Sequence, residues 1–323
     1  MKKILLALIL LISISAAKAQ VKFDALQVTP QMPKAGQTVS FKFNSKLSSL
    51  IDEKKVDVLV YLFGKNGYKV AEPKIVQTGA VYSGNFKLDT AVSCIAFGFS
   101  ANDAKAKDNN AGDGYIVPVY GNNNQPVTEY YVWAGRMYSG YGEQLFGMKT
   151  ITDKTLAILE EGLKLNPDAK NDISYFSAYL VAVNAAKKKD GEEPAILGLL
   201  RTLANKQDIK ETDYATLTQW YGRLKMKSTA DSFTTIMKAK YPDGNWRKNE
   251  AASAFNREKD VVKKLALYND YITKYPPTES NKALIDNFKS QMANAYANAK
   301  DFCSIRYMRC NLLHWHKHLL FAI

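Results

Sequence analysis

A 34-residue repeat is the strongest constraint that this sequence places on its fold. The phrases KYPDG and KYPPT place Pro242 and Pro276 at a 34-residue interval, and the same interval separates Tyr241 from Tyr275. Tetratricopeptide repeats have this period, because two antiparallel helices form each unit and a proline closes it. The stretch from Asp213 to Pro276 is therefore predicted to be a stacked helical scaffold.

The repeat is degenerate, because its two units match the tetratricopeptide pattern unequally. In the unit that Pro242 closes, the bulky, aromatic and small positions are all filled, by Tyr214, Leu217, Tyr221 and Ala230. The next unit keeps aromatic residues at Phe255 and Tyr268, but it has Lys248 and Lys264 where Tyr and Ala are expected. The pattern still predicts helices, and a scaffold of this kind usually binds a partner rather than catalysing a reaction.

The predicted partner of the helical repeats is a protein or an extended peptide. Stacked helix pairs form a concave surface, and exposed side chains of the first helix in each pair line it. The candidate lining residues are Gln219, Arg223, Arg247 and Asn249.

Short strands are predicted from Val21 to about Tyr120, ahead of the helices. About seven segments alternate or run apolar, and turn sequences such as PKAG and GKNG separate them. In GKNG, Asn66 and Gly67 suit the positive φ of a tight hairpin. So many short strands predict a two-sheet sandwich of the immunoglobulin type. The stretch PKAGQTVSF, residues 33–41, resembles the opening of many bacterial immunoglobulin-like modules.

The polar connector GNNNQP, residues 121–126, marks a change from strand-like to helix-like patterns. We place the domain boundary there. The predicted fold is multidomain, with an all-β immunoglobulin-like sandwich over residues 20–124 and an all-α tetratricopeptide-like domain over residues 125–302.

The first nineteen residues are predicted to be a secretory signal peptide. Lys2 and Lys3 precede an apolar run from Ile4 to Ile14, and Ala17-Lys18-Ala19 provides a small-x-small cleavage site. This run is too short to span a membrane, and no later run of 18 apolar residues follows it. The protein is therefore expected to be exported to a bacterial periplasm and to be soluble there, without a membrane span.

The formal net charge of +13 does not predict a nucleic-acid partner. Three of the basic residues belong to the signal peptide and three to residues 303–323, which leaves +7 on the rest of the chain. Lysines are interspersed there with acidic residues, as on an ordinary solvated surface. The oxygen-rich loop from Asn102 to Gly114 lacks the glycine and glutamate of a calcium-binding EF-hand, so a solvated hairpin loop is the favoured interpretation and a weak calcium site is the alternative. No cofactor is predicted.

Cys94 is predicted to be a buried and inert thiol. It lies in the apolar segment VSCIAFGFS, where alternation places it on one side with Val92, Ala96 and Gly98. A cysteine in such surroundings behaves as a small hydrophobic residue.

An aromatic cluster follows the connector, in YYVWAGRMYSGYGEQLFGM. Trp133 and Tyr138 are its candidate binding residues, together with Tyr130, Tyr131 and Tyr141. One interpretation is that the first helix, expected near residues 129–147, packs these rings against the sandwich. The other is an exposed aromatic surface for a peptide or a glycan.

The tail at residues 303–323, CSIRYMRCNLLHWHKHLLFAI, differs abruptly in composition from the rest of the chain. His314, His316 and His318 could share one side of a strand and bind zinc or copper, with Cys310 as a fourth ligand. A redox pair of Cys303 and Cys310 is a further alternative, although six residues separate the two cysteines. The favoured interpretation of residues 303–323 is an atypical tail that arises from a frameshift or a premature end.

Taken together, the β-module with its PKAG turn, the connector GYIVPVYG and the KYP repeats resemble the N-terminal part of large exported TlpA-like thiol–disulfide oxidoreductases. The phrases GRMYSGYGEQLFGM and LYNDYITKYP add to this resemblance, which covers about residues 20 to 302. The resemblance implies a C-terminal thioredoxin-like domain with a W-C-x-x-C motif, and the sequence contains no such motif. No catalytic residue is carried over, and the chain is expected to be a truncated or frameshifted member.

The predicted function is that of an exported, non-catalytic binding or scaffold protein, the accessory region of a thioredoxin-family oxidoreductase. One alternative is thiol–disulfide exchange or metal binding through the cysteine- and histidine-rich tail. A second is a glycan-binding module that uses the cluster around Trp133.

Overall fold

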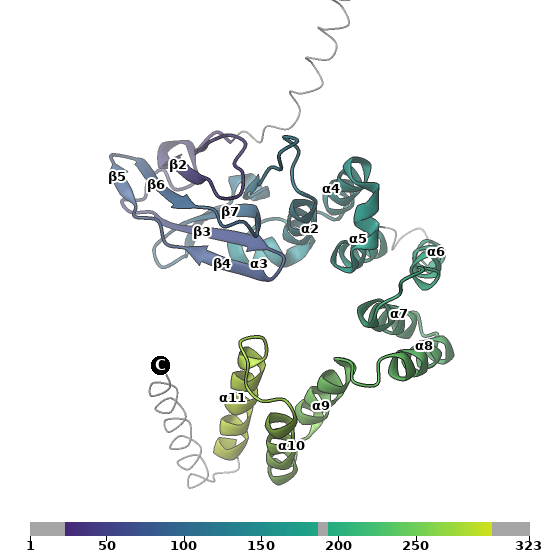
Figure 1. The fold of residues 1–323 in the computed structure, drawn as a ribbon. Coiled ribbons are helices and arrows are strands. Elements are labelled where there is room, and N and C mark those ends of the chain that lie inside the picture. The colour runs from purple at the N-terminus through teal and green to yellow at the C-terminus, as the bar shows by residue number, and fades with distance from the viewer. Residues whose placement is uncertain (1–22, 187–192, 299–323) are drawn as a thin grey trace, which may run out of the picture. The chain divides into compact units, whose positions relative to one another are not determined.

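The computed structural model describes residues 23–186 and 193–298, and Figure 1 shows their fold. The predicted signal peptide and the tail at residues 303–323 lie outside the described residues. Packing divides the chain into two compact units, with the division between Thr202 and Leu203. The structure therefore has a β-sheet region followed by a helical region, as the sequence predicts at this coarse level.

The strands of the first unit form two antiparallel sheets. In the first sheet the order is β1 (Leu26–Thr29), β2 (Thr38–Asn44), β6 (Val81–Lys87) and β5 (Val76–Thr78). In the second sheet the order is β4 (Gly67–Ala71), β3 (Asp57–Gly64), β7 (Val92–Ala101) and β8 (Ala106–Asp108), and β9 (Tyr115–Pro118) also pairs with β7. Gly64 and Gly67 form the last pair of the β3–β4 ladder, which confirms the predicted hairpin. Of the two residues expected to have a positive φ, Gly67 has one and Asn66 does not.

The two sheets pack face to face through one apolar core. Strand β2 shows why: its residues alternate, and Val39, Phe41 and Phe43 are buried while their neighbours face outward. Phe43 stacks on Phe99 of the other sheet with ring centroids 3.6 Å apart. Period-two alternation thus places the large side chains of β2 between the sheets.

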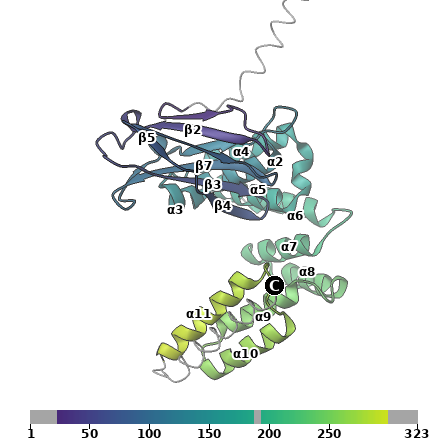
Figure 2. The same cartoon turned by 60° about the vertical axis from the view of Figure 1, so that its left-hand side comes forward.

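Strand β7 is buried along almost its whole length, because both of its faces are covered. One face belongs to the core between the sheets, and the other contacts helix α2 (Thr128–Arg136), the π-helix η4 (Met137–Tyr141) and helix α3 (Gly142–Phe146). Both views show α2 and α3 beside this sheet (Figures 1 and 2). Cys94 lies fully buried in this second layer, and burial raises the pKa of its thiol well above the ordinary value. The prediction of a buried thiol is thus confirmed.

Two longer helices complete the packed part of the first unit. Helix α4 (Thr152–Leu165) and helix α5 (Ile173–Ala186), joined by the short helix η5 (Pro167–Asn171), share an apolar cluster with α2. Gly162 permits their close approach, because a Cβ at this position would collide with Tyr175 and Tyr131. Helix α6 (Glu193–Ala204) follows.

Five helices of the second unit lie within the described residues: α7 (Glu211–Arg223), α8 (Lys227–Lys240), α9 (Trp246–Arg257), α10 (Val261–Lys274) and α11 (Lys282–Asn298). Helices α8 and α10 each have 14 residues, and their first residues are 34 apart. Buried positions recur at the same interval, in the pairs Tyr221 and Phe255, Ala230 and Lys264, and Met237 and Tyr271.

Lys264 shows how the second helix pair tolerates a long side chain at a position where the pattern expects Ala. The residue is buried, and its Nζ donates a hydrogen bond to the Glu258 carbonyl oxygen at 3.3 Å. Its ammonium also lies 4.5 Å from the centroid of the Phe255 ring. The charge is therefore both hydrogen-bonded and in contact with an aromatic face.

The connector at residues 121–126 lies where strand β9 gives way to helix α2. Because α2, α4 and α5 pack together beside the second sheet, the division between compact units falls later, after Thr202. A domain boundary at residues 124 and 125 stays a prediction. None of the helices within the described residues is long and apolar enough to cross a bilayer.

Candidate functional site

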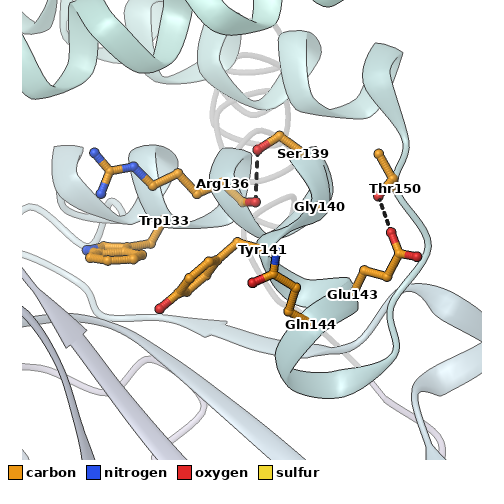
Figure 3. A pocket seen from close by; sticks show the side chains of 8 residues that line it. All are labelled: Trp133, Arg136, Ser139, Gly140, Tyr141, Glu143, Gln144 and Thr150. Atoms are coloured by element: carbon orange, nitrogen blue, oxygen red, sulfur yellow. Dashed lines mark hydrogen bonds between the residues drawn. The ribbon is translucent and has the colours of Figure 1, made fainter. Parts of the chain in front are cut away.

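An open pocket of about 1020 Å³ lies beside helices α2 and α3, in the first unit. Figure 3 shows the side chains that line it: Trp133, Arg136, Ser139, Gly140, Tyr141, Glu143, Gln144 and Thr150. Seven of these eight residues belong to one segment, residues 133–144. The local path of this segment therefore determines the shape of the pocket.

The segment changes from an α-helix to a π-helix directly after Arg136. Gly140 adopts a φ of +113°, which a residue with a Cβ rarely adopts. The wider turn is held from outside, since the Ile151 amide donates to the Tyr138 carbonyl oxygen at 2.9 Å. A helix over residues 129–147, weakened by its glycines, was expected, and it is interrupted at Gly140.

One wall of the pocket is aromatic. The Trp133 ring packs on Phe63 with centroids 4.8 Å apart, and its Nε1 donates a hydrogen bond to the Gly64 carbonyl oxygen at 3.3 Å. The Tyr141 ring lies 6.1 Å from the Trp133 ring and is half-buried. Burial, and then the nearby Tyr68, raise the pKa of the Tyr141 phenol. Both rings are thus fixed by the sheet before any ligand arrives.

Arg136 provides the positive charge of the pocket. Figure 3 shows its guanidinium above the Trp133 indole, and the distance from its Cζ to the ring centroid is 4.9 Å. Its Nη2 donates a hydrogen bond to Ser174 Oγ at 3.3 Å. Within the described residues it forms no ion pair, although its charge counteracts part of the rise that burial causes in the pKa of Glu129. The side chain is half-buried and held in one orientation.

Some of the other polar side chains in the pocket already form hydrogen bonds within the protein. Glu143 accepts a hydrogen bond from Thr150 Oγ1 at 2.9 Å, and Ser139 Oγ donates to the Arg136 carbonyl oxygen at 2.9 Å. Gln144 is exposed and adds a carboxamide to the rim. Glu143 is the one acidic residue among the eight lining residues.

A second, smaller hollow of about 170 Å³ adjoins the pocket. Arg136 and Ser139 line both. The remaining lining residues come from helices α2, α4 and α5 and are mostly small or apolar: Gly135, Thr155, Leu159, Ser177, Ala178 and Val181. The two hollows therefore meet at Arg136 and Ser139; the larger one is polar and aromatic, and the smaller one is mostly small or apolar.

The two aromatic residues named from the sequence have different surroundings. Trp133 lines the pocket although only 6 % of it is exposed. Tyr138 is buried in the layer between helix and sheet, where its Oη donates to the Asp113 carbonyl oxygen at 2.8 Å. Burial raises its pKa, and Lys154, 4.1 Å from the ring centroid, opposes this rise. Tyr138 is thus placed in the core and is not among the residues that line the pocket.

The candidate residues of the helical repeats lie in the second unit and are exposed on α7 and α9. The Cζ of Arg223 lies 4.9 Å from the centroid of the Trp220 ring. Arg247 pairs with Asp243 at 3.2 Å and lies 5.5 Å from the Trp246 ring centroid. Gln219 is exposed on α7.

The candidate residues of the tail, which are Cys303, Cys310, His314, His316 and His318, lie outside the described residues. Where side chains are described, no group of three or more His, Cys, Asp or Glu residues is placed to hold a metal ion. In the loop from Asn102 to Gly114, the Asp108 carboxylate instead accepts a hydrogen bond from the Tyr115 hydroxyl at 2.6 Å.

Sequence reasoning missed Arg136, the residue that joins the two hollows. One signal could have identified it, because the pattern Trp-x-Gly-Arg occurs twice, at residues 133–136 and 220–223. In both copies the guanidinium lies over the indole three residues earlier. No protein-family model matches the chain, and no curated protein matches it significantly.

Proposed function

We propose that this protein is a non-catalytic binding module and that the pocket around Arg136 and Trp133 is its ligand site. The observation that carries the proposal is a half-buried guanidinium, fixed over an indole and free of an ion pair within the described residues, in an open pocket. Pre-oriented aromatic and polar groups in a concave site are the usual elements of ligand recognition.

The chemistry of the lining residues favours binding over catalysis. General acid–base catalysis needs a titrating group within hydrogen-bonding reach of the substrate, often opposite a second one. Here Glu143, the single acid of the lining, is already engaged by Thr150. The thiol of Cys94 is fully buried and is not part of the pocket.

We further propose that the two sheets are an immunoglobulin-like sandwich and that the second unit is a degenerate tetratricopeptide-like array. The shared core of the two antiparallel sheets supports the first part. Recurrence of buried positions at 34-residue intervals in α7 to α10 supports the second. In this proposal the array acts as a spacer or a further protein-binding surface.

The family and the compartment are proposals as well. The order of a β-sheet region and a helical region supports an accessory region of an exported, periplasmic TlpA-like protein. The DNA that follows the coding sequence provides a test. A thioredoxin-like W-C-x-x-C segment there, in any frame, would support the assignment, and an unrelated gene would contradict it.

Selection from a library of random peptides displayed on phage tests the binding function. The enriched peptides are synthesised and titrated calorimetrically against the wild-type protein and two variants, Arg136→Gln and Tyr141→Ala. We expect a loss of affinity of at least about tenfold in each variant, because each loses a pre-oriented contact.

Arg223→Gln is the matched control, since it removes the same kind of guanidinium from over an indole in the second unit. Its affinity should equal that of the wild type. If instead Arg223→Gln abolishes binding and Arg136→Gln does not, the ligand site belongs to the helical repeats and the proposal for the pocket is wrong.

A further inference from the structure

We propose that the two adjoining hollows bind the C-terminal end of a peptide, with the terminal carboxylate on Arg136 and the last, apolar side chain in the smaller hollow. This inference rests on the proposed binding function and names its ligand. It is supported by three properties of the site: the shared wall of the two hollows, the charge of the larger one and the size of the smaller one.

The two hollows share a wall. Arg136 and Ser139 line both hollows, so a group bound at Arg136 lies at the junction between them. In a C-terminal residue, the carboxylate and the side chain leave the same Cα atom. One such residue can therefore place its carboxylate at the junction and its side chain in the smaller hollow, while the preceding residues lie in the larger pocket.

The charge of the site selects one carboxylate. Arg136 is stacked on Trp133 and hydrogen-bonded to Ser174, so its fork is oriented before a ligand binds. A guanidinium pairs with a carboxylate through two parallel hydrogen bonds, which no neutral group reproduces. Glu143, on the opposite side of the pocket (Figure 3), disfavours a ligand with further acids.

The smaller hollow has the size of a side chain. Its volume of about 170 Å³ is well below the roughly 300–1,000 Å³ of sites for drug-sized molecules. Leu159, Ala178 and Val181 line it, and Val181 is 44 % exposed. A Leu, Ile or Met side chain would bury its apolar surface against these three residues.

Three acetylated hexapeptides test the proposal by calorimetry with the full-length mature chain. They share the sequence Gly-Ser-Gly-Ser-Gly-x and end in leucine with a free acid, in leucine with an amide, or in glycine with a free acid. We expect the leucine acid to bind at least about tenfold more tightly than the amide, because the amide cannot form the charged pair. The glycine acid should also bind at least about tenfold more weakly, since it leaves the smaller hollow empty.

The variants connect this preference to the residues. Arg136→Gln should remove the difference between acid and amide, Arg136→Lys should restore part of it, and Val181→Asp should remove the preference for leucine. Arg257→Gln, at an exposed position of α9 that lines neither hollow, should change neither. Circular dichroism of each variant verifies its fold.

Two outcomes would overturn the inference. The first is equal affinity of the leucine acid and its amide. The second is an absence of binding by all three peptides while peptides from the phage selection, or chito-oligosaccharides, bind and lose affinity in Tyr141→Ala. That second result would leave the proposed binding function standing and would assign the site to another ligand.

Discussion

The two Trp-x-Gly-Arg segments have the same local geometry and very different surroundings. Each lies at the C-terminal end of a helix, α2 or α7, and in each the arginine Cζ lies 4.9 Å from the indole centroid. Both tryptophans are buried. Three-residue spacing on a helix places a side chain beside the one a turn earlier, so the short pattern determines the stacking in both units.

The path of the chain after each arginine makes the difference. After Arg136 the chain continues as a π-helix and lines an open pocket. After Arg223 the helix ends, and Lys225 adopts a φ of +60°. Arg136 is consequently half-buried and bonded to Ser174, while Arg223 is exposed. A local motif thus specifies a contact, and the tertiary surroundings decide whether that contact belongs to a site.

Removal of the tryptophan side chains should have the largest effect, and it tests whether the two segments are equally important for stability. Trp133→Ala and Trp220→Ala should each lower the free energy of unfolding by about 3–5 kcal/mol, as for other buried aromatic side chains. The decrease in free energy for Trp133→Ala includes the contribution of the hydrogen bond from Trp133 to the Gly64 carbonyl oxygen. Urea denaturation followed by circular dichroism measures both. A loss below about 1 kcal/mol at either position would show that its ring does not belong to a core.

The glycines between the two residues should respond in opposite directions. A Cβ at Gly135 would lie 3.2 Å from Leu159, which is almost fully buried, whereas a Cβ at Gly222 would have no neighbour within 4 Å. Gly135→Ala should therefore lower the free energy of unfolding by about 1–3 kcal/mol through overpacking. Gly222→Ala should raise it by about 0.5–1 kcal/mol, because alanine loses less conformational entropy in a helix.

Thermal unfolding of the two variants and the wild type measures this contrast. If both substitutions raise the unfolding temperature, Leu159 of α4 must move aside to make room for the added methyl group. In that case the packing of α2 against α4 would not explain why the first segment is held more tightly than the second.

The sequence allowed the coarse fold to be predicted because the patterns concerned are local. Alternation in the strands, the Asn66-Gly67 hairpin and the 34-residue period each depend on neighbours in the chain or on a fixed interval. The glycines at positions 135, 140 and 142 predict a weakened helix over residues 129–147, but they do not predict which of them interrupts it. In the structure it is Gly140.

The site was less predictable than the fold because its contacts cross long sequence distances. The indole of Trp133 is held by Gly64, 69 residues away, and the guanidinium of Arg136 by Ser174, 38 residues away. Trp133 was named because aromatic clusters are visible in a sequence. Tyr138 was named for the same reason, and its bond to Asp113 could not be foreseen.

Arg136 donates a hydrogen bond to Ser174, and Arg223 has no corresponding hydrogen bond within the described residues. Ser174→Ala should weaken binding of the leucine-acid hexapeptide by about twofold to tenfold, since the guanidinium loses one orienting hydrogen bond. Calorimetric titration measures the change, and Ala185→Ser, at an exposed position of the same helix that lines neither hollow, serves as the control. An unchanged affinity in Ser174→Ala would show that stacking on Trp133 alone orients Arg136.

Substitution of Glu129 should have the smallest effect. It tests the electrostatic interaction between this carboxyl and Arg136, the arginine of the first segment. Burial raises the pKa of this carboxyl, Asp172 adds to the rise, and Arg136 opposes it. The folded state therefore binds the proton more tightly than the unfolded state does. This contribution to stability is present at acid pH and is lost as the pH rises through the pKa of the folded state.

Glu129→Gln should accordingly be more stable than the wild type at neutral pH, and this advantage should shrink as the pH falls through the raised pKa of the wild-type carboxyl. Urea denaturation at several pH values measures the difference, with Glu160→Gln, at an exposed position of α4, as the control.

Glu129→Gln should also strengthen binding of the leucine-acid peptide, because it removes a negative charge near Arg136. A variant that is less stable at neutral pH would show that the attraction between Glu129 and Arg136 outweighs the cost of burying the carboxylate, and Arg136 would then be less available to a ligand than its geometry indicates.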